Sequence, residues 1–120
     1  MAARITRAAE APAYVAPLHE GVVTNRLQGI EAGPTEAFWV GNSVYPPGSR
    51  ALTAPTAAET VYVCLAGELV LRVTDGDTQT TTTLYAGDSA HMPRGTVRSV
   101  DNESTDDARL LVVIAVPRPD

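Results

Sequence analysis

The sequence contains few side chains that can exchange a proton near neutral pH. It has two histidines, His19 and His91, in 120 residues. Histidine titrates where acid–base chemistry needs it, and His91 lies between Ala90 and Met92 in a short apolar segment. His91 either serves a binding site as a proton-transfer group or is an exposed strand residue. His19 lies in a segment with no predicted structure, so it reaches a site only if that segment folds over the site's mouth.

Tyr62 is the other candidate for proton transfer. It lies in a segment rich in β-branched residues, and its hydroxyl can donate to or accept from a substrate oxygen. The alternative is an aromatic side chain that packs across strands. Cys64, two residues on, has no basic neighbour in the sequence to stabilise a thiolate. We therefore expect Cys64 to be a small core residue.

Short strands separated by turns dominate the chain, because nine prolines and nine glycines are spread along its length. Period-two alternation and β-branched runs predict strands over 37–45, 60–65, 68–74, 78–85, 89–92, 96–100 and 109–116. The last strand is almost wholly apolar, which predicts burial on both faces. Residues 1–20 hold no predicted element and form either an edge strand or an arm on a partner subunit. Residues 21–120 are expected to form one all-β domain, a sandwich or barrel.

The spacing of Gly87, Pro93, Gly95 and Asn102 matches four fixed positions of a known sequence motif. This spacing resembles the second motif of the cupin family, and Gly48 and Gly67 anchor the ends of a stretch similar to the family's first motif. The resemblance covers the central half of the chain. It implies a double-stranded β-helix (jelly-roll) barrel, a small-molecule substrate or ligand, and a homodimer formed through edge strands.

The departures from the family pattern concern the metal ligands. At the family's four metal-ligand positions this sequence has Ala54, Thr56, Thr60 and Arg98. Arginine is a permanent cation without a lone pair to donate, and Glu59 is one residue out of register. The resemblance therefore implies a cupin without the usual metal and without a cofactor. The alternative is a metal-dependent oxygenase whose non-standard site combines His19 and His91 with Glu20 or Glu59.

The family register, extended by period-two alternation, predicts which side chains line the barrel. The predicted substrate-binding residues are Arg50, Thr56, Thr60 and Asn102, with Trp39 and Tyr45 as aromatic walls. Arg98 either binds a carboxylate, phenolate or enolate of the ligand, or turns to the rim and pairs with an acidic residue. The acidic residues available there are Asp101, Glu103 and Asp107.

These observations predict an isomerase, cyclase or lyase acting on an acidic, enolic or phenolic substrate, in polyketide or other secondary metabolism. In this hypothesis Arg98 stabilises an enolate or phenolate, while Tyr62 or His91 transfers the proton. The alternative is a non-catalytic ligand-binding module. A net charge of -5 without any basic run argues against nucleic acid, and the lack of a long apolar run argues against a membrane span. A single cysteine fits a reducing cytoplasm.

Overall fold

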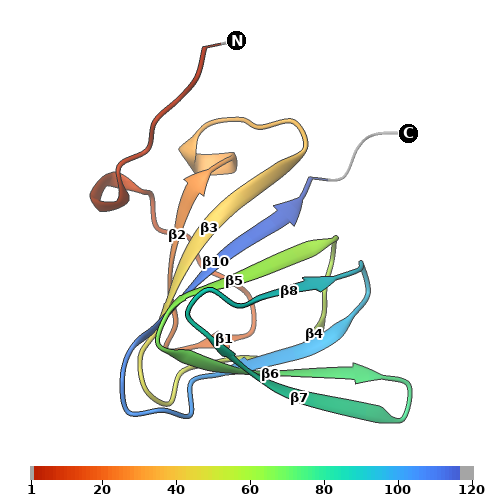
Figure 1. Ribbon diagram of the computed structural model, residues 1–120. Helices are drawn as coiled ribbons and strands as arrows, with labels where there is room; N and C mark the ends of the chain where they lie inside the picture. Colours follow the sequence, from red (N-terminus) through yellow and green to blue (C-terminus); the bar gives the residue numbers. More distant parts are fainter. Residues whose placement is uncertain (1, 117–120) are drawn as a thin grey trace.

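The computed structural model describes residues 2–116 and contains two five-stranded antiparallel sheets packed face to face (Figure 1). One sheet has the order β2 (Val23–Gln28), β3 (Phe38–Tyr45), β10 (Ala108–Ala115), β5 (Thr60–Ala66), β8 (Ser89–Met92). The other has the order β1 (His19–Glu20), β4 (Arg50–Pro55), β9 (Val97–Asp101), β6 (Glu68–Asp75), β7 (Thr78–Tyr85). Two single-turn 3-10 helices are η1 (Ala8–Glu10) and η2 (Ile30–Ala32). The predicted all-β jelly roll is confirmed.

The core lies between the two sheets. Alternate residues of each strand point inward, so Leu69, Leu71 and Val100 of one sheet meet Cys64 and Leu110 of the other. All five are at most 4% exposed. Cys64 is a core residue, as expected. No helix within residues 2–116 has the length and apolar character needed to cross a bilayer.

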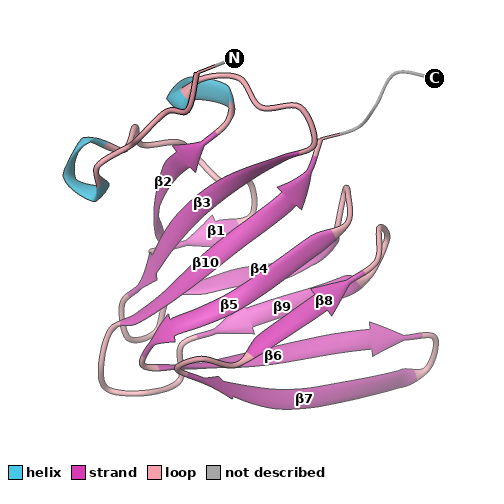
Figure 2. Cartoon of the chain, turned by 45° about the horizontal axis from the view of Figure 1, so that its top comes forward, coloured by secondary structure: helices cyan, strands magenta, loops and turns pink. Residues whose placement is uncertain are grey.

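The central strand β10 is apolar on both sides, but this chain covers only its inner side. Leu110 and Val112 are buried, whereas Leu111 and Val113 on the outer face are half-exposed. The expectation that β10 is buried on both faces is therefore wrong within the single chain, since no element among residues 2–116 packs over its outer side (Figure 2). The predicted homodimer stays a prediction.

The segment before β1 lies along an edge of its own chain. The Tyr14 amide donates to the Thr24 carbonyl at 3.1 Å, and the Arg26 amide donates to the Pro12 carbonyl at 2.7 Å. The edge of β2 is thereby partly paired. Further along, β1 pairs with β4, with His19 opposite Ala51. The backbone of residues 11–20 thus pairs with both sheets, although their sequence predicts no regular element.

The turns at one end of the barrel are held by Asn102. Its amide nitrogen donates to the carbonyls of Tyr45 and Asp106, and its oxygen accepts from the amide and hydroxyl of Ser104. The side chain is 1% exposed. Every hydrogen-bonding group of Asn102 is therefore used by the fold, which leaves none for the substrate-binding role predicted for it.

The turn between β5 and β6 requires glycine at Gly67, and a substitution there tests this requirement. The φ of Gly67 is +71°, and an added Cβ would lie 2.5 Å from the Asp107 carbonyl oxygen. We expect Gly67→Ala to lower the free energy of unfolding by about 2 kcal/mol or more, because left-handed strain and a backbone clash add. The control is Gly76→Ala, where φ is +62° and nothing lies within 4 Å. That change should cost about 1 kcal/mol in urea unfolding. Equal losses would contradict the clash.

Candidate functional site

An arginine and a tyrosine from opposite sheets meet inside the barrel. Arg98 Nε of β9 donates to the Tyr62 hydroxyl of β5 at 2.9 Å, and Arg98 Nη1 donates to the Leu52 carbonyl at 3.0 Å. Tyr62 is 5% exposed. The Tyr62 oxygen accepts from Arg98, so its own O–H proton is available to another acceptor. The Tyr62 hydroxyl is thus a potential proton donor that is hydrogen-bonded to the Arg98 cation.

A bulge in β4 gives Arg98 its second partner. Ala51 pairs with Val100 and Ala54 with Arg98, so between these pairs β4 has two residues where β9 has one. The extra residue interrupts the ladder, and the carbonyl of Leu52 accepts the hydrogen bond from Arg98. Sequence alternation alone cannot predict this bulge.

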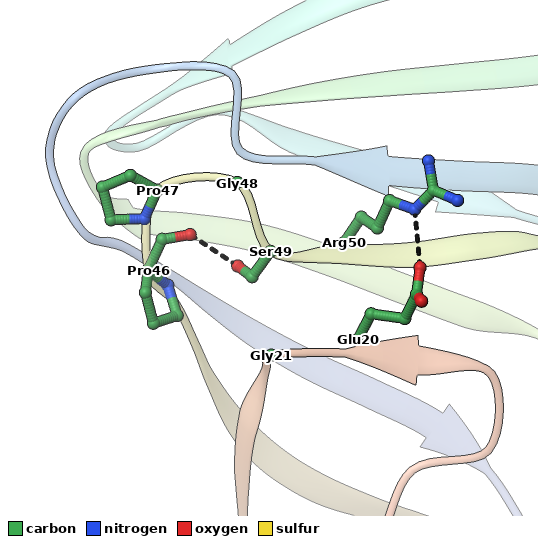
Figure 3. A pocket seen from close by; sticks show the side chains of 7 residues that line it. All are labelled: Glu20, Gly21, Pro46, Pro47, Gly48, Ser49 and Arg50. Atoms are coloured by element: carbon green, nitrogen blue, oxygen red, sulfur yellow. Dashed lines mark hydrogen bonds and ion pairs between the residues drawn. The ribbon is translucent and has the colours of Figure 1, made fainter.

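The same bulge reverses the inside-outside pattern of β4. Arg50, predicted to face the interior, instead points outward: its Nε donates to Glu20 Oε1 at 2.9 Å, and its side chain is 51% exposed (Figure 3). The pair borders an open hollow of about 500 Å³ at the Pro46–Gly48 turn. The inward position belongs to Ala51, which is 1% exposed. The predicted inward position of Arg50 is therefore wrong, because the β4 register shifts by one residue.

A second arginine, Arg26 of β2, is enclosed by aromatic rings. Its guanidinium carbon lies 3.6 Å from the Tyr14 ring centroid and 4.2 Å from the Trp39 ring. Arg26 Nε donates to Glu31 Oε1 at 2.8 Å, and the Arg26 side chain is 9% exposed. The charge of Arg26 is therefore compensated within the chain, by a carboxylate and by two π faces.

Of this cluster the sequence pointed only to Trp39. Thr24 and Arg26 are alternate, buried residues of β2, but polar residues at these positions give no sign in the sequence that they face inward. Hydrophobic periodicity finds inward positions only when they are apolar. The pairing of Tyr14 beside β2 depends on the tertiary structure.

Buried tyrosines surround the two arginines. Burial raises the pKa of Tyr14, an effect that Arg26 partly opposes and that the nearby Tyr62 and Glu31 reinforce. Burial raises the pKa of Tyr45 well above its usual range, with Tyr62 reinforcing and Arg98 opposing the rise. Both hydroxyls are thus neutral at physiological pH. Glu31 differs, because its hydrogen bond from Arg26 lowers the pKa of the carboxyl and keeps it ionised.

His19 faces the same interior. It pairs with Ala51 in register, and its Nδ1 lies 2.8 Å from the Pro17 carbonyl oxygen. Because a carbonyl only accepts, Nδ1 carries the proton, and the neutral ring has an unprotonated Nε2. Burial lowers the pKa of His19; the Pro17 carbonyl opposes this effect and Arg98 adds to it. His19 is therefore a neutral base candidate on the interior side of β1.

His91 lies on the other side of its strand. It pairs with Val61, whereas the inward Tyr62 pairs with Ala90. Its Nε2 is 2.6 Å from Glu59 Oε2, and the side chain is 55% exposed. The structure therefore separates His91 from Arg98 and Tyr62, with which the sequence analysis had grouped it.

Two threonines predicted to bind substrate are buried but hydrogen-bonded to the backbone. Thr56 Oγ1 donates to the Pro93 carbonyl at 3.0 Å, and Thr60 Oγ1 donates to the Ala58 carbonyl at 2.9 Å. Tyr45 is 1% exposed. These residues line the interior as predicted, while their direct contact with a substrate stays a prediction.

The donor set at the family's metal-ligand positions does not suit a divalent cation. Ala54 pairs with Arg98 across β4 and β9, so a methyl group and a guanidinium occupy two of the four positions. Neither can donate a lone pair to a metal, and the hydroxyl hydrogens of Thr56 and Thr60 go to backbone carbonyls. Within residues 2–116, no three His, Cys, Asp or Glu side chains gather in a metal-binding group.

The family model described as a cupin domain matches residues 41–114. The chain belongs to the cupin family. Beta-D-galactosidase Rv1717 of Mycobacterium tuberculosis is 53% identical over 114 residues, which are 95% of each chain. This cupin therefore has a curated relative that aligns over nearly its whole length.

Solved structures share the fold at lower sequence identity. The polyketide cyclase RemF of Streptomyces resistomycificus gives a TM-score of 0.80 at 20% identity, covering 100% of this chain and 83% of the other. A predicted oxalate decarboxylase of Thermotoga maritima gives 0.78 at 24% identity, covering 95% and 100%. The Drosophila melanogaster CENP-C cupin domain gives 0.73 at 15% identity, covering 93% and 80%. The same barrel fold thus occurs in a polyketide cyclase, a predicted oxalate decarboxylase and the CENP-C cupin domain.

The lowered pKa of His19 predicts a pH-dependent stability. Below the ordinary histidine pKa of about 6.5 the unfolded chain binds a proton that folded His19 resists, so stability should fall as pH decreases from there. We expect this loss to be smaller in His19→Gln, which keeps a donor for Pro17. Thermal unfolding at pH 7.5 and pH 5.0 measures both proteins, and carboxylate effects cancel in the comparison. Identical pH slopes would show that His19 titrates as it does in the unfolded chain.

Proposed function

We propose that this cupin is a small-molecule enzyme that hydrolyses β-D-galactosides inside its barrel. The observation that carries the proposal is the 53% identity, over 95% of both chains, with a protein named as a β-D-galactosidase. The inward-facing hydroxyls, arginines and histidine suit a substrate rich in hydroxyl groups, since each can hydrogen-bond to a sugar oxygen.

Glycoside hydrolysis needs two groups with opposite protonation states. One protonates the leaving oxygen, and a carboxylate stabilises or attacks the positively charged anomeric carbon. Tyr62 suits the first role, because its oxygen accepts from Arg98 and its proton can go to the glycosidic oxygen. Glu31 suits the second, because Arg26 lowers its pKa and keeps it ionised. Tyr14 lies near enough to both for each to raise its pKa.

The second candidate is metal-independent proton transfer by an isomerase, cyclase or lyase. The observation that favours it is the Arg98–Tyr62 pair itself, which is a cation hydrogen-bonded to a proton donor and has no carboxylate in contact within residues 2–116. In this candidate Arg98 stabilises an enolate or phenolate and Tyr62 or His19 moves the proton. A non-catalytic carrier would bind its ligand at the same side chains without turnover.

Leaving-group dependence tests the role of Tyr62. Tyr62→Phe should lower kcat/KM on methyl β-D-galactoside by about 100-fold or more, the usual range for a lost general acid. On 4-nitrophenyl β-D-galactoside the loss should be much smaller, because nitrophenolate leaves without protonation. Tyr85→Phe, at a residue 57% exposed, is the matched control and should change neither rate. Equal losses on both substrates would remove Tyr62 from the acid role.

Glu31→Gln should give the complementary pattern. A group that stabilises the anomeric centre is needed whatever the leaving group, so both substrates should lose at least about 100-fold in kcat. Glu36→Gln, on the exposed segment between η2 and β3, is the control. Full activity in Glu31→Gln would exclude this carboxylate from catalysis. A wild-type chain that hydrolyses neither galactoside but interconverts an enolisable substrate would favour the second candidate.

Metal independence has its own test. Because alanine and arginine replace two of the usual ligands, we expect full activity after exhaustive chelation and desalting. Elemental analysis after incubation with iron, zinc, manganese and nickel should find well under one metal per chain. Activity that is lost on chelation and restored by one metal would contradict this expectation.

A further inference from the structure

We propose that Arg98 forms an anion-binding subsite, so that the preferred ligand carries a fixed negative charge, such as a sugar carboxylate. This inference rests on the proposed function for the sugar class of the ligand. The negative charge of the ligand is inferred from the contacts of Arg98 alone.

The two arginines of the interior differ in their partners. Arg26 has a carboxylate at 2.8 Å and lies over the faces of two aromatic rings, Tyr14 and Trp39. Arg98 has only neutral partners, the Tyr62 hydroxyl and the Leu52 carbonyl. Within residues 2–116 no carboxylate lies within ion-pair distance of Arg98. The chain thus compensates one interior cation and leaves the other for an external anion.

The acidic residues nearest to Arg98 in the sequence are engaged elsewhere. On the outer face of the sheet, Arg72 Nη1 donates to Asp101 Oδ2 at 3.1 Å and Arg72 Nη2 donates to Glu103 Oε2 at 2.9 Å. The pleat explains this, because Val100 points inward with Arg98 while Asp101 points outward. Two rim partners that the sequence offered to Arg98 are thereby bound to another arginine.

The remaining interior groups add no negative charge. Tyr14 and Tyr45 are neutral, and His19 is neutral because burial and Arg98 both oppose its protonation. The positive charge of Arg26 and the negative charge of Glu31 cancel each other. Among the residues that the structure describes, the interior side chains therefore carry about one net positive charge, in a protein of net charge -5. A partly buried cation without a counter-ion is costly, and a ligand anion would relieve that cost.

One nitrogen of the Arg98 guanidinium has no hydrogen-bond acceptor among the described residues. Nε and Nη1 are used within the chain, while Nη2 donates to no residue between 2 and 116. The planar guanidinium is held at two nitrogens, so the direction of the Nη2 hydrogens is fixed before a ligand arrives. Such a fixed cationic donor is suited to a carboxylate oxygen.

The test compares two sugars that differ in one acidic group. Isothermal titration of the full chain with D-galacturonate and with D-galactose should show galacturonate binding about ten-fold more tightly or better, as one charged hydrogen bond implies. Raising the salt concentration should weaken galacturonate binding more than galactose binding. This wild-type comparison needs no variant to fold. Equal affinities, or no binding of either sugar, would overturn the proposal.

Variants of single arginines test whether Arg98 causes the preference for galacturonate over galactose. Arg98→Gln should bring the ratio of the two affinities close to one, while Arg98→Lys should keep part of the preference. Arg94→Gln, on the exposed turn before β9, removes an equal charge outside the barrel and should leave the ratio unchanged. A preference that survives Arg98→Gln overturns the subsite. Arg98-dependent binding without galactoside hydrolysis would leave the subsite standing and remove the proposed hydrolase. Galactoside hydrolysis together with equal affinities for galacturonate and galactose would support the hydrolase and remove the subsite.

Discussion

A guanidinium that connects two sheets is the interaction on which the interior of this barrel depends. Arg98 holds the hydroxyl of Tyr62 on the facing sheet and a backbone carbonyl of its own sheet. A charged group inside a barrel must be hydrogen-bonded, and these two contacts meet most of that requirement. They also fix the orientation of the Tyr62 hydroxyl. A metal would organise an ordinary cupin site, whereas here the ordering group is covalently part of the chain.

The motif positions separate into those that build the barrel and those that do chemistry. Asn102 secures the turns through four hydrogen bonds, and Gly67 keeps a backbone conformation that a side chain would obstruct. These positions keep the family's residues because backbone geometry demands them. The metal-ligand positions differ, because Ala54 and Arg98 offer no lone pair to a metal and yet pair with each other within the barrel.

The N-terminal segment makes the interior richer than the family motifs suggest. It places Tyr14 against Arg26 and His19 on the interior side of the opposite sheet. The aromatic enclosure of Arg26, with Glu31 as its counter-ion, contrasts with the uncompensated Arg98. Two arginines in one barrel thus have different electrostatic roles, since one is neutralised within the chain and the other is not.

The sequence by itself determined an all-β domain and most of its strands, because turn residues and period-two alternation are local signals. The resemblance to the cupin motifs narrowed the sandwich or barrel to a jelly roll. The motif spacing was also enough to place Arg98 and Tyr62 on inward positions. Tertiary structure alone decided that Arg50 faces outward, since the β4 bulge shifts the register by one residue without any signal in the sequence. It also decided which histidine reaches the interior: His19 does and His91 does not. The pairing of β1 with β4 and of β8 with β5 sets those directions, and strand pairing between distant segments is a property of the folded chain.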